Sequence, residues 1–175
     1  MKRLIIIGAG GYGQTVADVA DTLEIYDEIV FLDDNCVADS VLGKCEDYPK
    51  FISLQNDIYP AFGNNELRMS YIEKLEKTGA NIPTLIHESA YISKRAKLEK
   101  GVVVMPKAIV NTDTVIQKGC IINCGAIIDH GCVIEKGVHI CLSAIVKAEN
   151  QIPALMKVEA GQVIENRTYI LNGEK

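Results

Sequence analysis

The second half of the chain carries an aliphatic residue at every sixth position. The series runs without a break through Ile86, Ile92, Leu98, Val104, Val110, Ile116, Ile122, Ile128, Ile134, Ile140, Val146, Ile152, Val158, Ile164 and Ile170. A period of six fits neither an α-helix nor a two-sided strand. It indicates a solenoid of short strands and turns, in which three hexads form one triangular coil of about 18 residues. We therefore expect aliphatic residues 18 apart to stack in three interior columns, stabilised only by neighbouring coils.

Glycines and small residues keep the same register. Every glycine after Gly79 lies three residues beyond one of the aliphatic positions. These glycines, which we expect at turns that need unusual backbone angles, are Gly101, Gly119, Gly125, Gly131, Gly137, Gly161 and Gly173. The following residue is often small, as at Cys120, Ala126 and Cys132, and should fill an interior corner. Asn150, Met156 and Gln162 replace that small residue toward the C-terminus, so the last coils are irregular.

The first part of the chain alternates apolar runs with helical stretches. Strands are predicted over residues 2–8, 28–33, 51–54 and 58–62, and helices over residues 14–23 and 66–77. Such alternation predicts a parallel sheet. We therefore expect an α/β half-Rossmann domain over residues 1–82, followed by a parallel β-helix over residues 83–175.

A glycine-rich loop follows the first predicted strand. Gly8, Gly10 and Gly13 match the GxGxxG pattern, and Asp33 lies 20 residues beyond Gly13. Backbone N–H groups at the start of a helix attract a diphosphate. The pattern alone leaves open a nucleotide sugar, a nicotinamide cofactor or a purely structural turn. A domain of about 80 residues favours the nucleotide sugar, because a dehydrogenase normally needs a longer sheet.

Composition excludes several classes of function. The net charge of -5 argues against a nucleic-acid partner, which would require clustered Lys and Arg. No run of 18 apolar residues predicts a membrane span, and the run from Leu4 to Ile7 is too short for a signal peptide. We expect a cytoplasmic protein. The six cysteines form no CxxC pair, which favours buried free thiols over a metal site or a disulfide, and no metal is expected.

Four motifs occur together over residues 2 to about 146. They are GAGGYG at residues 8–13, FLDD at residues 31–34, GNNxxR from Gly63 to Arg68, and LIH at residues 85–87, just before the hexads. This combination resembles the nucleotide-sugar acetyltransferases of the bacillosamine and sialic acid pathways (PglD/NeuD-like), which belong to the hexapeptide-repeat acyltransferases. The resemblance implies a left-handed β-helix, acetyl-CoA as co-substrate, and a homotrimer with active sites between neighbouring subunits. The front domain would hold the UDP of a UDP-4-amino-sugar through Gly8, Gly10, Gly11, Tyr12, Gly13, Asp33, Asp34 and Asn64.

The resemblance also implies a catalytic base. The family's motif, Glu/Asp-His-Glu/Asp, matches Asp129-His130-Gly131, which makes His130 the general base. An imidazole, with an unperturbed pKa of about 6.5, suits proton removal from an attacking amine or hydroxyl. Gly131 replaces the second carboxylate, so Asp129 and Glu135 are the candidates for orienting the base.

The acetyl-CoA site is expected at His139, Ser143 and Ala148, where the last two stand at positions usually held by glycine in the family. The expected reaction is acetyl-CoA-dependent acetylation of the amino group of a UDP-linked 4-amino-sugar, for surface glycan synthesis. Two alternatives stay open. One is a sialic-acid-type O-acetyltransferase; the other is a nucleotide-sugar-binding scaffold without CoA activity, suggested by Gly131, Ala148 and the irregular tail.

Overall fold

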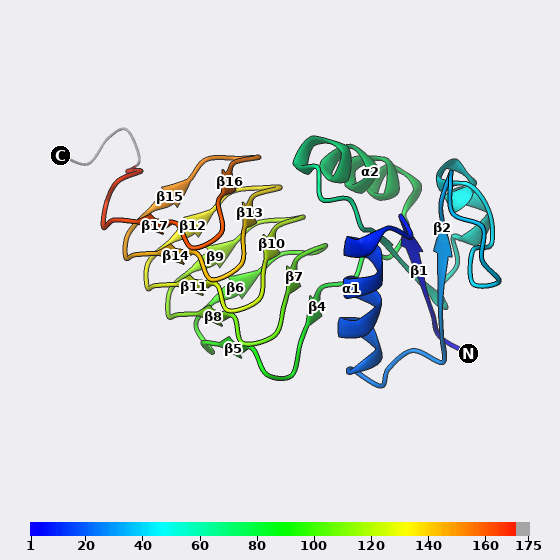
Figure 1. The fold of residues 1–175 in the computed structure, drawn as a ribbon, viewed down its shortest axis with the longest axis horizontal. Coiled ribbons are helices and arrows are strands. Elements are labelled where there is room, and N and C mark those ends of the chain that lie inside the picture. Colours follow the sequence, from blue (N-terminus) through cyan, green and yellow to red (C-terminus); the bar gives the residue numbers. More distant parts are fainter. Residues whose placement is uncertain (171–175) are drawn as a thin grey trace. The chain divides into compact units, whose positions relative to one another are not determined.

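The chain forms two compact units in a computed structural model that describes residues 1–170 (Figure 1). The first unit is Met1–Leu85, and the second begins at Ile86. The boundary expected between residues 82 and 83 lies three residues earlier. Gly173, one of the glycines expected at turns, lies outside the described residues, as does the expected end of the second domain at residue 175.

The first unit is built on a three-stranded parallel sheet with the order β2-β1-β3 (Figure 1). Its strands are β1 (Arg3–Ile7), β2 (Glu28–Leu32) and β3 (Asn56–Pro60). Its helices are α1 (Gly11–Asp21), α2 (Asn65–Thr78) and the 3-10 helix η1 (Cys45–Phe51). The central strand β1 is fully buried from Leu4 to Ile7, as expected for a parallel strand covered on both faces. This is the predicted half-Rossmann arrangement.

The strand predicted over residues 51–54 is wrong. Phe51 ends η1, and it packs with Ile52 against the core of the first unit, while Leu54 is fully exposed. The apolar residues therefore form the end of a short helix, and only one side of this helix is buried. Helix α1 also begins at Gly11 rather than residue 14, and the Gln14 N–H donates to Gly10 O at 3.0 Å in its first turn.

The second unit is a left-handed parallel β-helix of two-residue strands. They form three sheets, which we name sheets B, C and D. Sheet B holds β4 (Leu85–Ile86), β7 (Val103–Val104), β10 (Ile121–Ile122), β13 (His139–Ile140) and β16 (Lys157–Val158). Sheet C holds β5 (Tyr91–Ile92), β8 (Ile109–Val110), β11 (Ile127–Ile128), β14 (Ile145–Val146) and β17 (Val163–Ile164). Sheet D holds β6 (Lys97–Leu98), β9 (Val115–Ile116), β12 (Val133–Ile134) and β15 (Gln151–Ile152).

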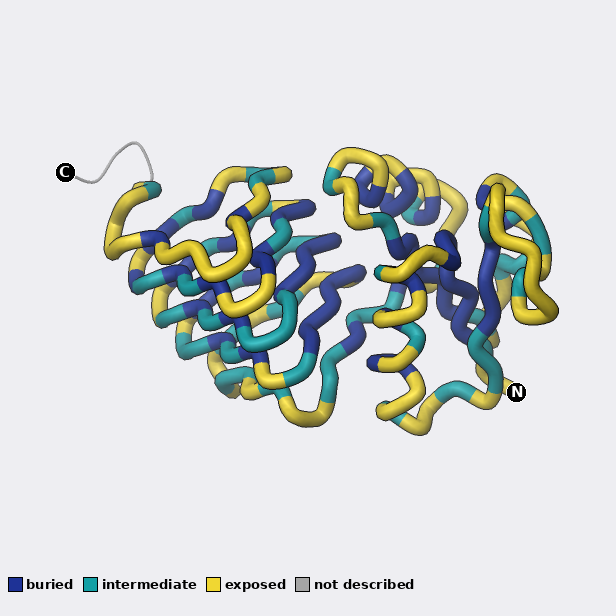
Figure 2. Tube along the Cα trace, viewed as in Figure 1, coloured by how far each residue is buried: buried dark blue, intermediate teal, exposed yellow. Residues whose placement is uncertain are grey.

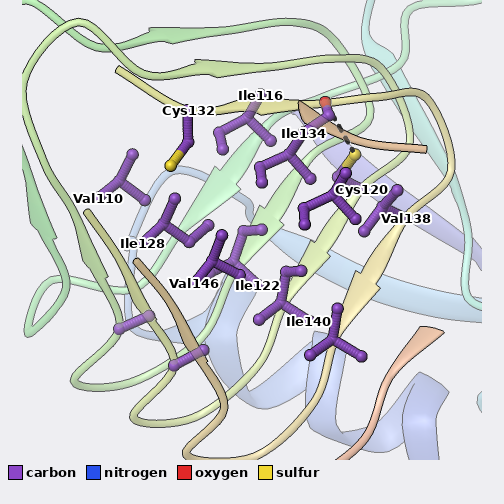
Figure 3. Close-up of a cluster of buried hydrophobic side chains, with 14 of the residues drawn as sticks. Val110, Ile116, Cys120, Ile122, Ile128, Cys132, Ile134, Val138, Ile140 and Val146 are labelled. Atoms are coloured by element: carbon purple, nitrogen blue, oxygen red, sulfur yellow. Dashed lines mark hydrogen bonds between the residues drawn. The ribbon is translucent and has the colours of Figure 1, made fainter. Parts of the chain in front are cut away.

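The three predicted aliphatic columns are confirmed. Ile122 pairs with Val104 and Ile140, and Ile128 pairs with Val110 and Val146. The aliphatic series from Val104 to Ile164 is buried, and these side chains point into one shared interior (Figure 3). Exposure is highest at the outer turns of the coils (Figure 2). The small residues Cys120, Ala126 and Cys132 are fully buried, as predicted for interior corners.

The turns use glycine and other residues alike. The predicted turn glycines within the described residues have left-handed backbone angles, as at Gly131 with φ of 67°. Six further turns of the β-helix place side-chain-bearing residues in the same conformation: Lys107, Asp113, Ser143, Glu149, Leu155 and Arg167. These positions cost more backbone strain than glycine does. They hold side chains at the corners of the coils.

The last position of the aliphatic series does not join the interior. Ile170 is half exposed, and Tyr169 packs against the core instead. The Gln151 N–H donates to Tyr169 O, whereas the corresponding Val133 N–H donates to Asn150 O. The final coil is therefore displaced by one residue, which turns the opposite side chain inward. Buried Asn150 holds this coil, because its amide donates to Lys147 O and Glu165 O, at 2.8 Å each, and accepts from the Tyr169 N–H.

Candidate active site

His130 lies at the corner between sheets C and D, two residues after the end of β11. The Asp129 carboxylate accepts the His130 backbone N–H at 2.7 Å and lies 3.0 Å from the imidazole Nδ1. The His130 N–H bond is the main reason that the pKa of Asp129 is lowered, and the imidazole and the Asn111 amide lower it further. An ionised partner at Nδ1 keeps a proton on that nitrogen of a neutral ring, which leaves Nε2 as the acceptor. The His130 side chain is 55% exposed, so the ring is accessible from solvent.

Glu135, the other candidate for orienting the base, is engaged elsewhere. Its carboxylate accepts from the Gln151 amide and, at 2.9 Å, from the Ala154 N–H. These contacts tie the corner between sheets D and B to the next coil. Of the two candidates, Asp129 is the one that contacts His130.

The residues expected at the acetyl-CoA site are spread over two sides of the β-helix. His139 lies in β13 of sheet B, where its Nε2 is 3.1 Å from the Asn123 amide nitrogen. Ser143 follows at the corner between sheets B and C, with φ of 53°. Ala148 comes 18 residues, or one coil, after His130, so it stacks on the His130 corner. Asn123 was not among the predicted site residues; it lies two residues after Ile121, which is one coil before His139.

His130 and His139 do not share one corner. Partners in neighbouring coils are 18 residues apart, as Ile122 and Ile140 are. The nine residues between the two histidines are therefore half a coil, which places them on opposite sides of the triangular section. Within one copy of the chain, each histidine has its own polar partner, Asp129 or Asn123.

In the first unit, the glycine loop lies at the carboxyl end of the central strand β1. Gly8 has φ of 104°, and a Cβ built on Gly13 would lie 2.0 Å from Gly8 O. Only glycine fits at position 13, because helix and strand approach closely there. No atom lies within 4 Å of a Cβ built on Gly10 or Gly11. The start of α1 is therefore open to an anion at its free N–H groups.

Asp33 and Asp34 brace the neighbouring loops. The Asp33 carboxylate accepts the N–H groups of Ala9, Asn35 and Cys36 at 2.7–2.8 Å. The Ala9 bond is the largest reason that the pKa of Asp33 is lowered. The Asp34 carboxylate accepts the Cys45 N–H at 3.0 Å. Both carboxylates therefore shape the loops at this edge of the sheet.

The remaining predicted residues lie beside β3. The Tyr12 hydroxyl is 3.1 Å from the Tyr59 hydroxyl, and burial is the main reason that the pKa of Tyr12 is raised. The Asn64 side chain accepts the Leu67 N–H at 2.8 Å and so caps α2. Strand order reverses at β1, with β2 on one side and β3 on the other. Ligands of open α/β sheets bind outside the carboxyl ends of the strands at such a point.

The GNNxxR motif fixes the loop after β3. Fully buried Arg68 donates through Nη1 to Phe62 O and through Nη2 to the Asn65 side chain, at 2.8 Å each. A buried guanidinium with several acceptors holds its loop in one conformation. The motif thus supports the edge of the sheet at which the glycine loop lies.

Membrane-spanning helices and metal-binding clusters are absent from residues 1–170. No helix in this range is long and apolar enough to cross a membrane. No group of three His, Cys, Asp or Glu side chains in the same range could hold a metal ion. All six cysteines are free thiols.

Comparison with known proteins places the chain in a family. Residues 3–75 match the PglD N-terminal domain. A UDP-N-acetylbacillosamine N-acetyltransferase of Bacillus subtilis (strain 168) is 33% identical over 114 residues, which cover 60% of this chain and 52% of that relative. The match thus spans about half of that relative's length.

Solved structures agree over nearly the whole chain. The acetyltransferase domain of PglB from Neisseria gonorrhoeae FA1090 is 35% identical, with a TM-score of 0.93 over 95% of this chain and 84% of that one. The same domain in complex with acetyl coenzyme A gives a TM-score of 0.91 at 35% identity, over 95% and 83% of the two chains. PerB from Caulobacter crescentus, in complex with CoA and GDP-perosamine, is 23% identical with a TM-score of 0.79, over 95% and 90% of the two chains, and supports the fold alone. The chain is therefore a member of the PglD-like acetyltransferase family.

Proposed function

We propose that this protein transfers the acetyl group of acetyl-CoA to the amino group of a UDP-linked 4-amino-sugar, in the cytoplasm, for surface glycan synthesis. The observation that carries the proposal is the Asp129–His130 pair, with Nδ1 held at 3.0 Å and the His130 side chain 55% exposed. Two comparisons support it: the match to a domain bound to acetyl coenzyme A, and the match to a UDP-N-acetylbacillosamine N-acetyltransferase. The six free thiols suit a reducing compartment.

In the proposed reaction, the amine nitrogen of the sugar attacks the thioester carbonyl carbon of acetyl-CoA. His130 accepts the amine proton at Nε2, and the Asp129 carboxylate stabilises the imidazolium through Nδ1. The tetrahedral intermediate then collapses, breaking the carbon–sulfur bond. The products are the amide and the CoA thiol, which takes up the proton. No acyl-enzyme is required.

Backbone and side-chain groups of the next coils would hold the acyl donor. Ala148 stacks on the His130 corner, and its N–H has no acceptor within residues 1–170. We propose this N–H as a donor to the oxyanion of the tetrahedral intermediate. His139 and Ser143 lie away from the His130 corner of their own chain. They would therefore contact the CoA whose acetyl group lies beside the His130 of a neighbouring subunit.

This division supports a homotrimer with sites between subunits. The outer face of sheet C is apolar along its length, through Tyr91, Ile109, Ile127, Ile145 and Val163. Sheet C lies between sheets B and D in chain order. A threefold arrangement with sheet C inward would therefore bring the His130 corner of one copy toward the His139 face of the next. Burying such a stripe also removes an exposed apolar patch from water.

The nucleotide would bind at the carboxyl edge of the first unit's sheet. Gly8, Gly10, Gly11 and Gly13 form the loop, and the open space at Gly10 and Gly11 admits a diphosphate. Asp33, Asp34 and Asn64 would act through their backbone and by holding the loops, since their carboxylate or amide oxygens already accept N–H groups. Tyr12 would offer its hydroxyl beside Tyr59.

Thiol release from acetyl-CoA, with a UDP-4-amino-sugar as acceptor, tests the proposal. Turnover by the wild type and its loss in His130→Ala support it. Equal rates in wild type and His130→Ala would contradict the role of the base. Consumption of a hydroxyl acceptor in preference to the amine would select O-acetylation. Calorimetry that finds binding of the UDP-sugar but not of acetyl-CoA would select a scaffold protein, the reading suggested by Gly131, Ala148 and the irregular tail.

A further inference from the structure

A symmetric ladder of charges runs along the corner that carries His130. Residues 18 apart stack here, and the stack is Arg95, Asp113, Gly131, Glu149 and Arg167. The outer members are cations, the inner members are carboxylates, and glycine stands at the centre. Arg95 pairs with Asp113 at 2.8 Å, and Arg167 pairs with Glu149. Each carboxylate beside Gly131 is therefore held from its far side by an arginine.

Of the two carboxylates in this ladder, Glu149 is the one that contacts His130 through its backbone. Its backbone N–H donates to His130 O at 3.1 Å. Its side chain lies beside Gly131, because a Cβ built on Gly131 would lie 3.6 Å from Glu149 Cγ. The pKa of Glu149 is lowered first by Arg167 and, to a smaller degree, by the charge of His130. The glutamate and the imidazole are thus close enough for their charges to interact.

Given the function proposed above, we infer that Glu149 is a positioning residue for the base. Its carboxylate, one coil after His130, favours the imidazolium that forms when His130 takes the amine proton. Arg167 limits this effect by pairing with the same carboxylate. Asp129 and Glu149 therefore act on the imidazole from two different coils.

Other charged groups near the His130 corner form ion pairs with one another. Lys147 stacks one coil after Asp129 and pairs with Glu165 at 2.5 Å. Asp113 and Arg95 lie on the preceding coils and pair with each other. Glu149 and Asp113 each have their cation partner on the coil farther from His130, and Glu149 is the one of the two whose backbone N–H donates to His130 O. Removing Arg167 should therefore free Glu149 toward the imidazole.

Proton NMR titration of the imidazole tests the inference without requiring turnover. The chain has three histidines, so His130→Asn assigns the resonance. Glu149→Gln should move the titration midpoint of the His130 ring to lower pH by about 0.5 unit, because an opposite charge that favours the protonated ring is lost. Arg167→Gln should move the midpoint to higher pH.

Glu165→Gln is the matched control. It breaks the Lys147 ion pair between the same two coils, so it reproduces the loss of an inter-coil pair and should shift the midpoint less than Glu149→Gln does. The ascending limb of the kcat/KM profile should follow the NMR midpoints. Identical midpoints in wild type and Glu149→Gln would overturn the inference, as would an equal shift in Glu165→Gln. If Glu149→Gln does not fold, an unchanged midpoint in Arg167→Gln overturns it. Shifted midpoints with no acetyl transfer by the wild type would instead contradict the proposed function.

Discussion

At the scale of single residues, the structure assigns carboxylates to two different tasks. Asp129 accepts one backbone N–H and contacts the imidazole that we propose as the base. Asp33 accepts three backbone N–H groups and holds the loop beside the first strand. Both carboxylates lie directly after a strand. Their tasks differ because Asp129 is followed by a histidine ring that it contacts, whereas Asp33 accepts the N–H groups of the loop that follows it.

Replacing Asp129 by Asn should slow acetyl transfer without unfolding the protein. The amide cannot stabilise an imidazolium as the carboxylate does. A hydrogen bond to a charged group contributes about 1.5–3 kcal/mol, which corresponds to a rate loss of roughly 10- to 100-fold. Steady-state kinetics would check kcat/KM, and Glu135→Gln, which alters a carboxylate away from His130, should keep it within about threefold. A larger loss in Glu135→Gln than in Asp129→Asn would reverse the assignment.

Asp33→Asn should destabilise the first unit at pH 7 and much less at acid pH. The folded-state pKa of Asp33 is lowered, so its stabilisation is present above the unfolded value of about 3.9 and is lost as the pH falls through the folded value. We expect a loss of about 1–2 kcal/mol at pH 7. Urea unfolding followed by tyrosine fluorescence, at pH 7 and near pH 3, measures the difference. An equal loss at both values would mean that the carboxylate charge has no role.

At the scale of elements, glycine performs distinct functions within one loop. Gly13 allows close contact of α1 with Gly8 O, whereas Gly10 and Gly11 leave open space at the helix start. The helix begins on these glycines. The same sequence pattern thus combines a packing requirement with an accessible surface.

Gly13→Ala should strongly destabilise the first unit, because its Cβ would lie 2.0 Å from Gly8 O. Overpacking of this kind costs about 1–3 kcal/mol or more. Gly11→Ala is the matched control: it meets no atom within 4 Å and adds a better helix former. Thermal unfolding of both variants would check this, and comparable melting temperatures would contradict the close approach.

At the scale of the whole molecule, the β-helix presents faces of different character. The outer positions of sheet C are occupied by apolar side chains, including Tyr91 at 58% and Val163 at 44% exposure. Sheet D carries Lys97 and Gln151 at its outer positions. Sheet C is therefore the face that we expect to be covered by further copies of the chain.

Ile145→Glu, at the outer face of sheet C, should dissociate the proposed homotrimer. A charge placed inside an apolar interface loses its hydration without a partner. Sedimentation equilibrium would show monomers, with an unchanged circular dichroism spectrum. Lys97→Glu places the same side chain on sheet D and should leave the assembly intact. If Ile145→Glu kept the mass of the wild type, sheet C would not be the interface.

The repeat of six by itself determined the β-helix, its three columns and the small interior corners, as at Ile122 and Cys120. Each of these depends on a local pattern that recurs every coil, so errors at one position do not change the others. The GxGxxG pattern likewise determined that a loop begins at Gly8 and connects the first strand to the first helix. The motif and family resemblance also predicted the acetyltransferase family to which the comparisons assign the chain.

Only the tertiary structure decided which side chains meet. It separated Asp129 from Glu135, placed Glu149 over the His130 corner, and turned Tyr169 inward in place of Ile170. It also showed that the apolar run after residue 50 ends a helix rather than forming a strand. These outcomes depend on the directions of side chains from neighbouring coils and on the hydrogen bonds available at each corner. Residue spacing records how often a position recurs along the chain, but not which of its neighbours in space it will contact.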